Sequence, residues 1–370
     1  MRVLVTGDNG FISKNLISFL KEKLEFQVFS FSRDVTDENL DSLVKKSDFI
    51  FHLAGVNRPK EVSEFKNINV GVTEKICKSL RTTNRKIPIV FSSSIQAELN
   101  NDYGQSKLEA EKILLNLENE TGSPVFIFRM PNVFGKWSKP NYNSVVATFC
   151  YNISHDLPIQ INNPETEIIL VYIDDVVEKF YSILKSPHDK KEDTVIHPQY
   201  KISLGELAKL LYKFRDSRKN LVTEKVGCGF VRSLYSTYMS YLEPENFKYT
   251  LPSYTDERGE FVEMLKTTDS GQFSFFTAKP GVTRGGHYHH TKTEKFLVIK
   301  GKAKFGFRHL ITNENHTIYT SGDFPEIVET IPGWVHDITN VGEEEMIVML
   351  WANEIFDRSK PDTYSQKVLV

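Results

Sequence analysis

The chain has 370 residues, of which 40% are hydrophobic and 25% charged, and this composition excludes a disordered, collagen-like or coiled-coil protein. At roughly 150 residues per domain, the length predicts two domains. The 46 Lys and Arg residues against 48 Asp and Glu give a net charge of -2, so the overall charge does not attract the protein to nucleic acid or to an anionic membrane.

The cysteines and the apolar runs point to a reducing compartment. Cys77, Cys150 and Cys228 lie far apart and form no CxxC pair, which argues against a disulfide framework and a cysteine zinc site. The first strand begins at Arg2 without a secretory h-region, and no apolar run approaches the roughly 18 residues that span a bilayer. We expect a soluble, cytoplasmic protein.

The first two thirds of the chain alternate short apolar runs with helical periodicity. We expect strands at residues 3–5, 27–31, 49–53 and 89–91 and helices at 11–24, 70–81 and 103–117. This alternation predicts βαβ units on a doubly wound parallel sheet, an α/β fold.

Beyond Tyr249 the pattern changes to short strands separated by glycine and proline turns. Strands are expected at residues 296–299, 303–307 and 346–351, and this pattern of short strands and turns predicts an all-β barrel or sandwich. The polar, proline-containing segment 241–248 has the composition of a linker, so we predict domains at 1–245 and 246–370.

The turn after the first strand, Thr6-Gly-Asp-Asn-Gly-Phe-Ile-Ser13, is suited to a dinucleotide. One glycine allows the tight turn, and the other lets the backbone approach a pyrophosphate at a helix N-terminus. Ser13 stands where a third glycine is usual, but its side chain is small. The expected cofactor contacts in this turn are Gly7, Asn9, Gly10, Phe11 and Ile12.

The end of the second predicted strand bears on the choice of cofactor. Ser32 and Arg33 follow it, and an arginine there accommodates the 2′-phosphate of NADPH. Asp34 comes next, and a carboxylate in that place would instead hold the ribose of NADH. We predict NADPH, with Ser32 and Arg33 among its contacts.

A tyrosine and a lysine one turn apart suggest a hydride-transfer site. Tyr103 and Lys107 share one helix face. A free tyrosine has a pKa of about 10, and a neighbouring ammonium is expected to lower it toward the working range. A serine hydroxyl at the preceding strand end, Phe91-Ser-Ser-Ser94, would hold a substrate carbonyl while a nicotinamide delivers hydride.

This half resembles an extended short-chain dehydrogenase/reductase. The matching segments, in the family's order, are Thr6–Ile12, His52–Gly55, Phe91–Ser94, Tyr103–Lys107, Arg129–Gly135 and Val171–Asp175. The resemblance implies a Rossmann-type sheet that binds NAD(P), with cofactor contacts from Leu53, Ala54 and Gly55, and activity on nucleotide sugars. It places the catalytic roles on Ser94, Tyr103 and Lys107, with Lys107 also holding the nicotinamide ribose.

Two points of this resemblance stay open. Only eight residues separate Ser94 from Tyr103, fewer than relatives carry, so the choice among Ser92, Ser93 and Ser94 is not fixed. Sugar-nucleotide contacts are expected from the Asn132 segment and from residues 142–144.

The second half contains a histidine–carboxylate box. His287 and His289, two apart on a strand, point to one face; Glu294 begins the next strand, where a hairpin would place it opposite them, and His336 arrives from a distant strand. Three imidazoles and one carboxylate suit Zn, Fe, Mn, Ni or Cu. We expect one divalent metal, with zinc as first choice, and His290 is an additional candidate ligand.

The box resembles both motifs of the cupin family, which implies a small β-barrel. Asp256–Phe261 and Arg284–His289 also resemble segments of the sugar-nucleotide 3,5-epimerases, which are cupins that use no metal. In those enzymes the histidine removes a proton beside a keto group, so His287 is either a metal ligand or a catalytic base. We expect Glu260 and Glu263 to lie on a solvated face.

Together the halves resemble the bifunctional enzymes of capsular polysaccharide assembly, on the route to N-acetyl-L-fucosamine. The resemblance implies C3 epimerisation of a UDP-2-acetamido-2,6-dideoxy-4-keto-hexose and then NADPH-dependent C4 reduction to UDP-2-acetamido-2,6-dideoxy-L-talose. A homodimer is expected, with a UDP-sugar substrate and no nucleic-acid or membrane partner. Two alternatives remain: a single-activity NADPH 4-keto-sugar reductase whose metal-bound cupin is structural, and a non-enzymatic redox sensor.

Overall fold

The computed structural model describes residues 1–32, 37–187 and 193–369. Its contacts divide the chain into two compact units, Met1–Leu211 with Arg232–Leu242, and Tyr212–Val231 with Glu243–Val370. The boundary between residues 245 and 246 remains a prediction, and the structure adds that Tyr212–Val231 groups with the second unit. Each unit is described by itself.

The first unit is built on a five-stranded parallel sheet with strand order β2-β1-β3-β4-β5. Helices cover both of its faces, so its central strands are apolar on both sides: Val3, Leu4 and Val5 are each fully buried. The predicted Rossmann-type sheet is therefore confirmed. The strands are β1 (Arg2–Thr6), β2 (Gln27–Phe31), β3 (Phe49–His52), β4 (Ile89–Ser94) and β5 (Val125–Met130).

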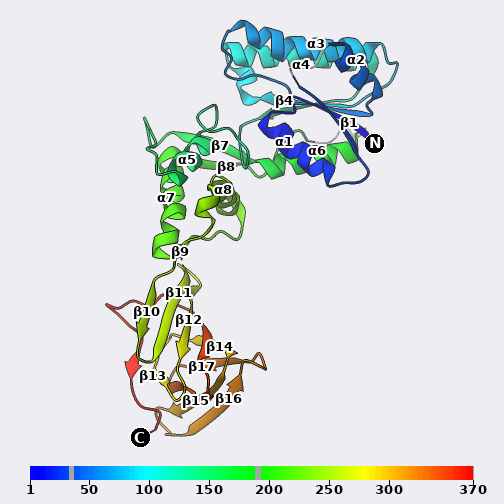
Figure 1. Ribbon diagram of the computed structural model, residues 1–370. Helices are drawn as coiled ribbons and strands as arrows, with labels where there is room; N and C mark the ends of the chain where they lie inside the picture. The colour runs from blue at the N-terminus through cyan, green and yellow to red at the C-terminus, as the bar shows by residue number, and fades with distance from the viewer. Residues whose placement is uncertain (33–36, 188–192, 370) are drawn as a thin grey trace. The chain divides into compact units, whose positions relative to one another are not determined.

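Because strand side chains alternate, β1 feeds two cores. Val3 and Val5 pack with α1 and α6 on one face, whereas Leu4 packs with α2, α3 and α4 on the other, as the two helical layers of Figure 1 show. The helices are α1 (Phe11–Lys21), α2 (Asp37–Lys46), α3 (Gly71–Arg81), α4 (Asp102–Thr121) and α6 (Ile173–Lys185), with the short turns η1 (Phe65–Val70) and η2 (Ile95–Glu98).

The strand order reverses between β1 and β3, and nucleotides bind such sheets in the crevice outside the strand ends at this point. Gly7 follows β1 with a φ of +72°, in the left-handed region that favours glycine. A Cβ at Gly7 would lie 2.7 Å from the Cα of Ala54, just beyond β3. The glycine therefore lets the two strand ends meet.

A smaller three-stranded sheet, with order β6-β7-β8, lies in the first unit. The elements that follow β5 are β6 (Asn132–Phe134), α5 (Val145–Ser154), β7 (Glu167–Tyr172), β8 (Tyr200–Ser203), α7 (Leu204–Asn220) and α8 (Gly229–Met239), of which α7 and α8 have residues in both units. The short elements β9 (Val222–Thr223) and η3 (Pro244–Phe247) belong to the second unit, in which β9 pairs with β11 (Gly259–Thr267). Among the described residues no helix combines the length and apolar character needed to cross a membrane.

The second unit is an all-β barrel of two mostly antiparallel sheets, with orders β10-β11-β12-β19-β14-β17 and β16-β15-β18-β13-β20. Aromatic side chains of both sheets, including Phe276, Phe296 and Phe305, meet in its core. The strands are β10 (Ser253–Asp256), β11 (Gly259–Thr267), β12 (Gly271–Ala278), β13 (Thr283–Tyr288), β14 (Glu294–Lys300), β15 (Lys302–His309), β16 (Asn315–Ser321), β17 (Ile327–Thr330), β18 (Trp334–Asn340), β19 (Met346–Ala352) and β20 (Tyr364–Ser365). The predicted cupin barrel is confirmed.

One expectation about this barrel is wrong. β13 and β14 do not form a hairpin, because β13 pairs with β18 and β20 in one sheet while β14 pairs with β17 and β19 in the other. Residues 289–293 cross between the sheets. Glu294 therefore approaches the histidines across the barrel interior rather than along a shared ladder.

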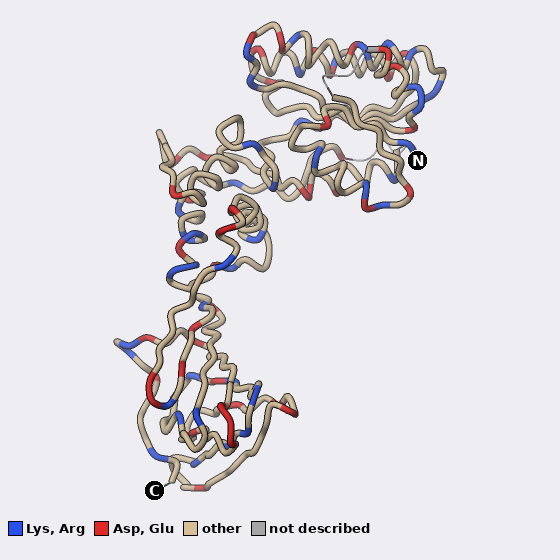
Figure 2. Tube along the Cα trace, in the orientation of Figure 1, with Lys and Arg blue, Asp and Glu red and all other residues tan. Residues whose placement is uncertain are grey.

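Charged side chains of both signs are interspersed along both units (Figure 2). This distribution matches the near balance of 46 basic and 48 acidic residues.

Candidate active sites

The ends of β1, β2 and β3 converge where the sequence predicts a dinucleotide site. The Gly7 amide donates to the Phe31 carbonyl (2.8 Å), and the Ala54 amide donates to Thr6 Oγ1 (3.1 Å). These bonds bring Gly7, Ser32 and Ala54 to one edge of the sheet. Arg33, on which the NADPH prediction depends, lies outside the described residues.

Helix α1 presents an N-terminus to this edge. Its N-cap is Gly10, in extended conformation and with no side-chain cap, so no side chain covers the first-turn N–H groups of Phe11 and Ile12. Such an end favours an anion. Ser13 is buried, and its Oγ donates to the Thr6 carbonyl (3.4 Å), so a small polar side chain fits at the place of the usual third glycine.

A buried histidine connects the strand ends below this edge. His52 Nδ1 lies 2.9 Å from Thr6 Oγ1, and its Nε2 lies 2.8 Å from Thr73 Oγ1. Burial, aided by the Lys107 charge, lowers the pKa of His52 to about 3, so the imidazole is neutral. The hydrogen-bonded chain fixes the turn that carries Ala54.

Ser94, Tyr103 and Lys107 meet at the carboxyl end of β4. The Tyr103 side chain interacts with Ser94, and Lys107 Nζ donates to the Ser92 carbonyl (2.8 Å). Lys107 also touches the cofactor edge, since a Cβ at Gly55 would lie 3.1 Å from its Nζ. Burial lowers the pKa of Lys107 to about 8, and the Glu111 carboxylate opposes part of that shift.

The three consecutive serines of β4 have different partners. Ser93 Oγ donates to the buried carboxylate of Glu111, which is paired with Arg129 (2.6 Å) on β5. Ser92 offers its carbonyl to Lys107, whereas Ser94 Oγ accepts from the Gln96 amide (3.2 Å). Of the three serines, Ser94 is the one whose side chain interacts with the tyrosine.

The expected lowering of the tyrosine pKa does not occur in this structure. Burial raises the pKa of Tyr103 above its ordinary value, and the interaction with Ser94 opposes that shift only in part. The Lys107 ammonium is engaged by the Ser92 carbonyl. Desolvation of the phenolate therefore outweighs any attraction to the lysine.

Asn69 is a residue of this site that the sequence analysis missed. Its Oδ1 accepts from the Val56 amide (2.7 Å), and its Nδ2 donates to the Val56 carbonyl (3.0 Å) and to Ser106 Oγ (2.9 Å). It thereby ties the loop after Gly55 to helix α4. Asn69 lies in the π-helical turn η1, and a widened turn of this kind leaves no mark in hydrophobic periodicity.

In the barrel, the four predicted metal-binding residues come together. One ligand atom from each of His287, His289, Glu294 and His336 lies within 4.8 Å of the others. His287 and His336 are direct partners in the ladder between β13 and β18, with ring centroids 4.6 Å apart. Glu294 is the first residue of β14 in the facing sheet.

The protonation of His289 bears on what this cluster can hold. Its Nδ1 donates to the Asp362 carbonyl (2.5 Å), which leaves the Nε2 lone pair facing Glu294 Oε2 at 3.1 Å. A lone pair and a carboxylate at this distance repel unless a cation, either a proton or a metal ion, lies between them.

Three further observations bear on whether the cluster fits a metal ion. His336 Nε2 is buried and has no hydrogen-bond partner among the described residues. Burial, with a smaller contribution from His336, lowers the pKa of His287 to about 3 and keeps it neutral. Burial acts to raise the pKa of Glu294, but its contacts with His289 and His336 outweigh burial and hold it well below the usual value. A neutral imidazole at His287 and an ionised carboxylate at Glu294 fit a divalent metal.

His290 lies outside the cluster. Its side chain is exposed, and its ring contacts Tyr288 and Tyr364 with centroid separations of 5.5 and 4.9 Å. It follows His289 directly in the segment that crosses between the sheets, where its backbone amide donates to Asp362 Oδ1 (2.9 Å).

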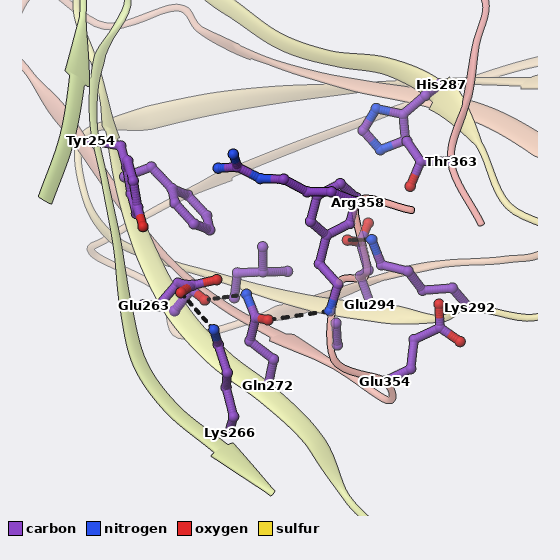
Figure 3. Close-up of a pocket in the computed structure, with 15 residues that line it drawn as sticks. Tyr254, Glu263, Lys266, Gln272, His287, Lys292, Glu294, Glu354, Arg358 and Thr363 are labelled. Atoms are coloured by element: carbon purple, nitrogen blue, oxygen red, sulfur yellow. Dashed lines mark hydrogen bonds and ion pairs between the residues drawn. The ribbon is translucent and has the colours of Figure 1, made fainter. Parts of the chain in front are cut away.

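A cavity of about 830 Å³ opens over the cluster, and Figure 3 shows His287 and Glu294 on one side of it, with Tyr254 and Glu263 on the other. Glu263 forms an ion pair with Lys266 (2.8 Å), with side-chain exposures of 17% and 18%. The expectation of a solvated face is therefore wrong for Glu263. A β-bulge between Glu263 and Leu265 shifts the register of β11 at this point. A second cavity, of about 210 Å³, is lined by His287, Glu294 and Arg284.

Known protein families match both halves of the chain. Residues 3–197 match the NAD dependent epimerase/dehydratase family, and residues 254–364 match the polysaccharide biosynthesis C-terminal domain. A Pseudomonas aeruginosa protein named UDP-2-acetamido-2,6-beta-L-arabino-hexul-4-ose reductase is 58% identical over 368 residues, covering 100% of this chain and 99% of the relative.

Solved structures agree with this assignment. The Staphylococcus aureus capsular polysaccharide assembling protein CapF superposes with a TM-score of 0.92 at 43% identity, covering 99% of this chain and 100% of that chain. A Bacillus cereus UDP-glucuronic acid 4-epimerase in complex with NAD has a TM-score of 0.55 at 16% identity, covering 65% of this chain and 98% of its own, and so shares the fold alone. The chain thus belongs to the NAD dependent epimerase/dehydratase family, as an extended short-chain dehydrogenase/reductase fused to a cupin-type polysaccharide biosynthesis C-terminal domain.

Proposed function

We propose that the first unit is an NADPH-dependent 4-ketoreductase of a UDP-2-acetamido-2,6-dideoxy sugar. The observation that carries this proposal is the buried Lys107, whose Nζ donates to the Ser92 carbonyl (2.8 Å) at the strand end next to the dinucleotide edge, on the same helix as Tyr103. The name of the 58% identical relative supplies the substrate class.

The side chains divide the chemistry of reduction among them. Ser94 holds the substrate carbonyl oxygen and Tyr103 donates its proton to that oxygen. NADPH supplies the hydride to C4 of the sugar. Lys107, positively charged at pH 7 with a pKa of about 8, holds the nicotinamide ribose and favours the tyrosinate that remains until solvent returns a proton.

The cofactor contacts in this proposal are the predicted ones: Gly7, Asn9, Gly10, Phe11, Ile12, Ser32, Arg33, Leu53, Ala54, Gly55, Tyr103 and Lys107. The preference for NADPH over NADH rests on Arg33 following Ser32 in the sequence. A direct comparison of NADPH and NADH dissociation constants, for the natural chain and for Arg33→Ala, tests that preference.

For the second unit we propose C3 epimerisation of the same 4-keto sugar before reduction. A 4-keto group acidifies the C3–H bond, so a base can remove that proton to give an enolate, and reprotonation on the opposite face inverts C3. His287, His289, Glu294 and His336 would hold one divalent ion, preferably zinc, which would stabilise the negative charge that develops on the substrate oxygen. His287 as the base, rather than a ligand, is the alternative assignment.

Reduction then makes the inversion irreversible, and the product is UDP-2-acetamido-2,6-dideoxy-L-talose, a precursor for N-acetyl-L-fucosamine in capsular polysaccharide. The similarity to the capsular polysaccharide assembling protein supports this role. A cytoplasmic homodimer is part of the same proposal.

The test uses the UDP-4-keto sugar in D2O, with product followed by NMR. We expect deuterium to enter C3 without NADPH, and the 4-alcohol to form only with NADPH. Tyr103→Phe should lower the reduction rate by 10² to 10⁴ and leave C3 exchange intact, whereas His336→Gln should abolish exchange.

Two results would point elsewhere. Clean NADPH-dependent alcohol formation without C3 exchange would leave the single-activity reductase with a structural metal. No NADPH oxidation with any UDP-4-keto sugar would leave the redox sensor. Metal retention by His287→Gln, with exchange lost, would favour His287 as the base.

A further inference from the structure

The last part of the chain runs along the loop that carries the metal-binding residues. We call residues 353–366, which follow β19, the C-terminal strap. Beside it lie residues 287–293, which contain His287 and His289 and end directly before Glu294. Three of the four cluster residues thus belong to, or directly follow, one segment that the strap contacts.

The two ends of the strap are attached by backbone pairing. Its β20 pairs with β13, with Ser365 opposite His287 and Tyr364 opposite Tyr288. At the other end the Asn353 amide donates to the Thr293 carbonyl (3.1 Å), and Asn353 Oδ1 accepts from the Thr293 amide (3.0 Å). The loop is therefore held at both of its ends by the same segment.

Asp362 holds the middle of the loop. Its carboxylate accepts three consecutive backbone amides, those of His290 (2.9 Å), Thr291 (2.7 Å) and Lys292 (2.9 Å), and also the Thr291 hydroxyl (3.0 Å). Its backbone carbonyl accepts from His289 Nδ1 (2.5 Å). One residue thus shapes the loop and directs the His289 Nε2 lone pair toward the cluster.

The Lys292 side chain extends this arrangement to the carboxylate ligand. Its amide is held by Asp362, and its Nζ lies 3.0 Å from Glu294 Oε1, which leaves Oε2 facing His289 and His336. Both groups are buried, with side-chain exposures of 9% and 6%. The loop conformation set by Asp362 therefore also determines which oxygen of Glu294 faces the histidines.

The strap is at the same time a wall of the cavity over the cluster. Glu354, Phe356, Arg358 and Thr363 line that cavity, and Figure 3 shows Arg358 and Thr363 on the side of His287 and Glu294. The Phe356 amide also bonds Gln272 Oε1 (3.4 Å) on β12. Hydrogen bonds thus join the strap both to the loop and to Gln272 in the cavity wall.

We propose that the C-terminal strap, through Asp362, positions the ligands of the metal site by hydrogen bonds, so that metal binding is coupled to docking of the strap on the loop. The inference rests on the proposed metal site and adds a positioning residue to it. Because coupling between two equilibria is reciprocal, a docked strap raises metal affinity and bound metal strengthens docking. Mutation of a residue that hydrogen-bonds a metal ligand typically lowers metal affinity 10- to 100-fold.

The first experiment measures zinc affinity of the full chain by competition with a chromophoric chelator. Asp362→Ala and Asp362→Asn are expected to weaken zinc binding by 10- to 100-fold. The matched control is Asp357→Ala: Asp357 lies in the same strap and accepts the Ser359 amide (2.8 Å) and hydroxyl (2.7 Å) in a local turn, and among the described residues no hydrogen bond joins its carboxylate to the loop. It should bind zinc as the natural chain does.

The second experiment follows amide hydrogen exchange of the same full-length proteins with and without zinc. Zinc should slow exchange at the amides of His290, Thr291 and Lys292 in the natural chain, and much less in Asp362→Ala. Unchanged protection of the β12 and β19 amides would show that the barrel remains folded and that only the contacts of Asp362 with the loop are lost.

The outcomes distinguish the two proposals. Zinc affinity of Asp362→Ala equal to that of the natural chain, or equal loss in Asp357→Ala, would overturn the strap inference and leave the metal site standing. Absence of zinc binding by the natural chain would overturn the metal site itself.

Discussion

Lys107 combines deep burial with a positive charge. Its side chain is 4% exposed, its Nζ donates to the Ser92 carbonyl (2.8 Å), and the ammonium lies 4.9 Å from the centroid of the Phe91 ring. These partners do not offset the loss of water, because burial lowers the pKa of the amine from 10.5 to about 8. The folded state therefore holds this proton less tightly than the unfolded chain.

The sign of the resulting pH dependence follows from that difference. Between pH 8 and 10.5 the unfolded chain binds more protons at Lys107, so stability rises with pH in this window; below pH 8 both states are protonated and the burial penalty is fully present. Relative to Lys107→Met, the free energy of unfolding of the natural chain should rise by about 3 kcal/mol between these pH values. Urea unfolding followed by circular dichroism measures this, and a flat difference would contradict it.

Single residues also show where local reasoning stops. The spacing of Tyr103 and Lys107 correctly predicts a shared helix face, but the sign of the tyrosine pKa shift depends on how deeply the phenol is buried. Three adjacent serines are equivalent in sequence, yet Ser93 bonds Glu111 while Ser94 interacts with Tyr103, because alternate side chains of β4 leave opposite faces.

Among the elements, the turn between β1 and α1 has the strictest requirement. Gly7 has a φ of +72°, and a Cβ there would lie 2.7 Å from the Cα of Ala54. Gly71, in contrast, lies at the start of helix α3 with a φ of -62°, and a Cβ there would have 3.7 Å to the nearest atom, the Lys66 carbonyl oxygen. The two glycines form a matched pair for substitution.

Gly7→Ala should destabilise the first unit by about 2 kcal/mol or more, from the left-handed backbone and the forced separation of the strand ends. It should also weaken NADPH binding at least tenfold, measured by nucleotide fluorescence. Gly71→Ala should be neutral or stabilise by about 0.5–1 kcal/mol, because alanine favours a helix. Equal stability and equal nucleotide affinity of the two variants would contradict this reading of the turn.

The loop between β13 and β14 shows the limit of prediction at this scale. The motif correctly brings His287, His289 and Glu294 together, but a hairpin is the wrong route. A short gap between two strands is equally compatible with a hairpin and with a crossing between stacked sheets. The strand pairing, and not the spacing, decides between them.

At the scale of the whole molecule, each proposed site lies within one compact unit. Ser94, Tyr103 and Lys107 belong to the first, and the His/Glu cluster belongs to the second. Each unit is therefore expected to carry out its step without the other's catalytic residues.

A mixture of two inactive variants tests this independence. Tyr103→Phe retains only the epimerisation step and His336→Gln only the reduction step, so neither alone should convert the un-epimerised substrate with NADPH. Mixed in equal amounts, they should restore NADPH oxidation, measured by absorbance, since the epimerised intermediate can pass through solvent. A mixture no more active than its parts would contradict free exchange of the intermediate.

The sequence by itself determined the two fold classes, because periodicity of 3.6 and of 2 and the turn residues are local properties. It also determined the identity of the chemical groups, from the turn at Gly7 and Gly10 to Tyr103, Lys107 and the histidine box. Only the tertiary structure decided which serine interacts with Tyr103, how burial shifts the pKa values, and that Glu263 lines a cavity. It alone brought Asn69 and Asp362 to the sites, since hydrogen bonds between residues far apart in the chain, 37 positions for Asn69 and Ser106 and 70 to 72 positions for Asp362 and the loop, leave no periodic trace in a single chain.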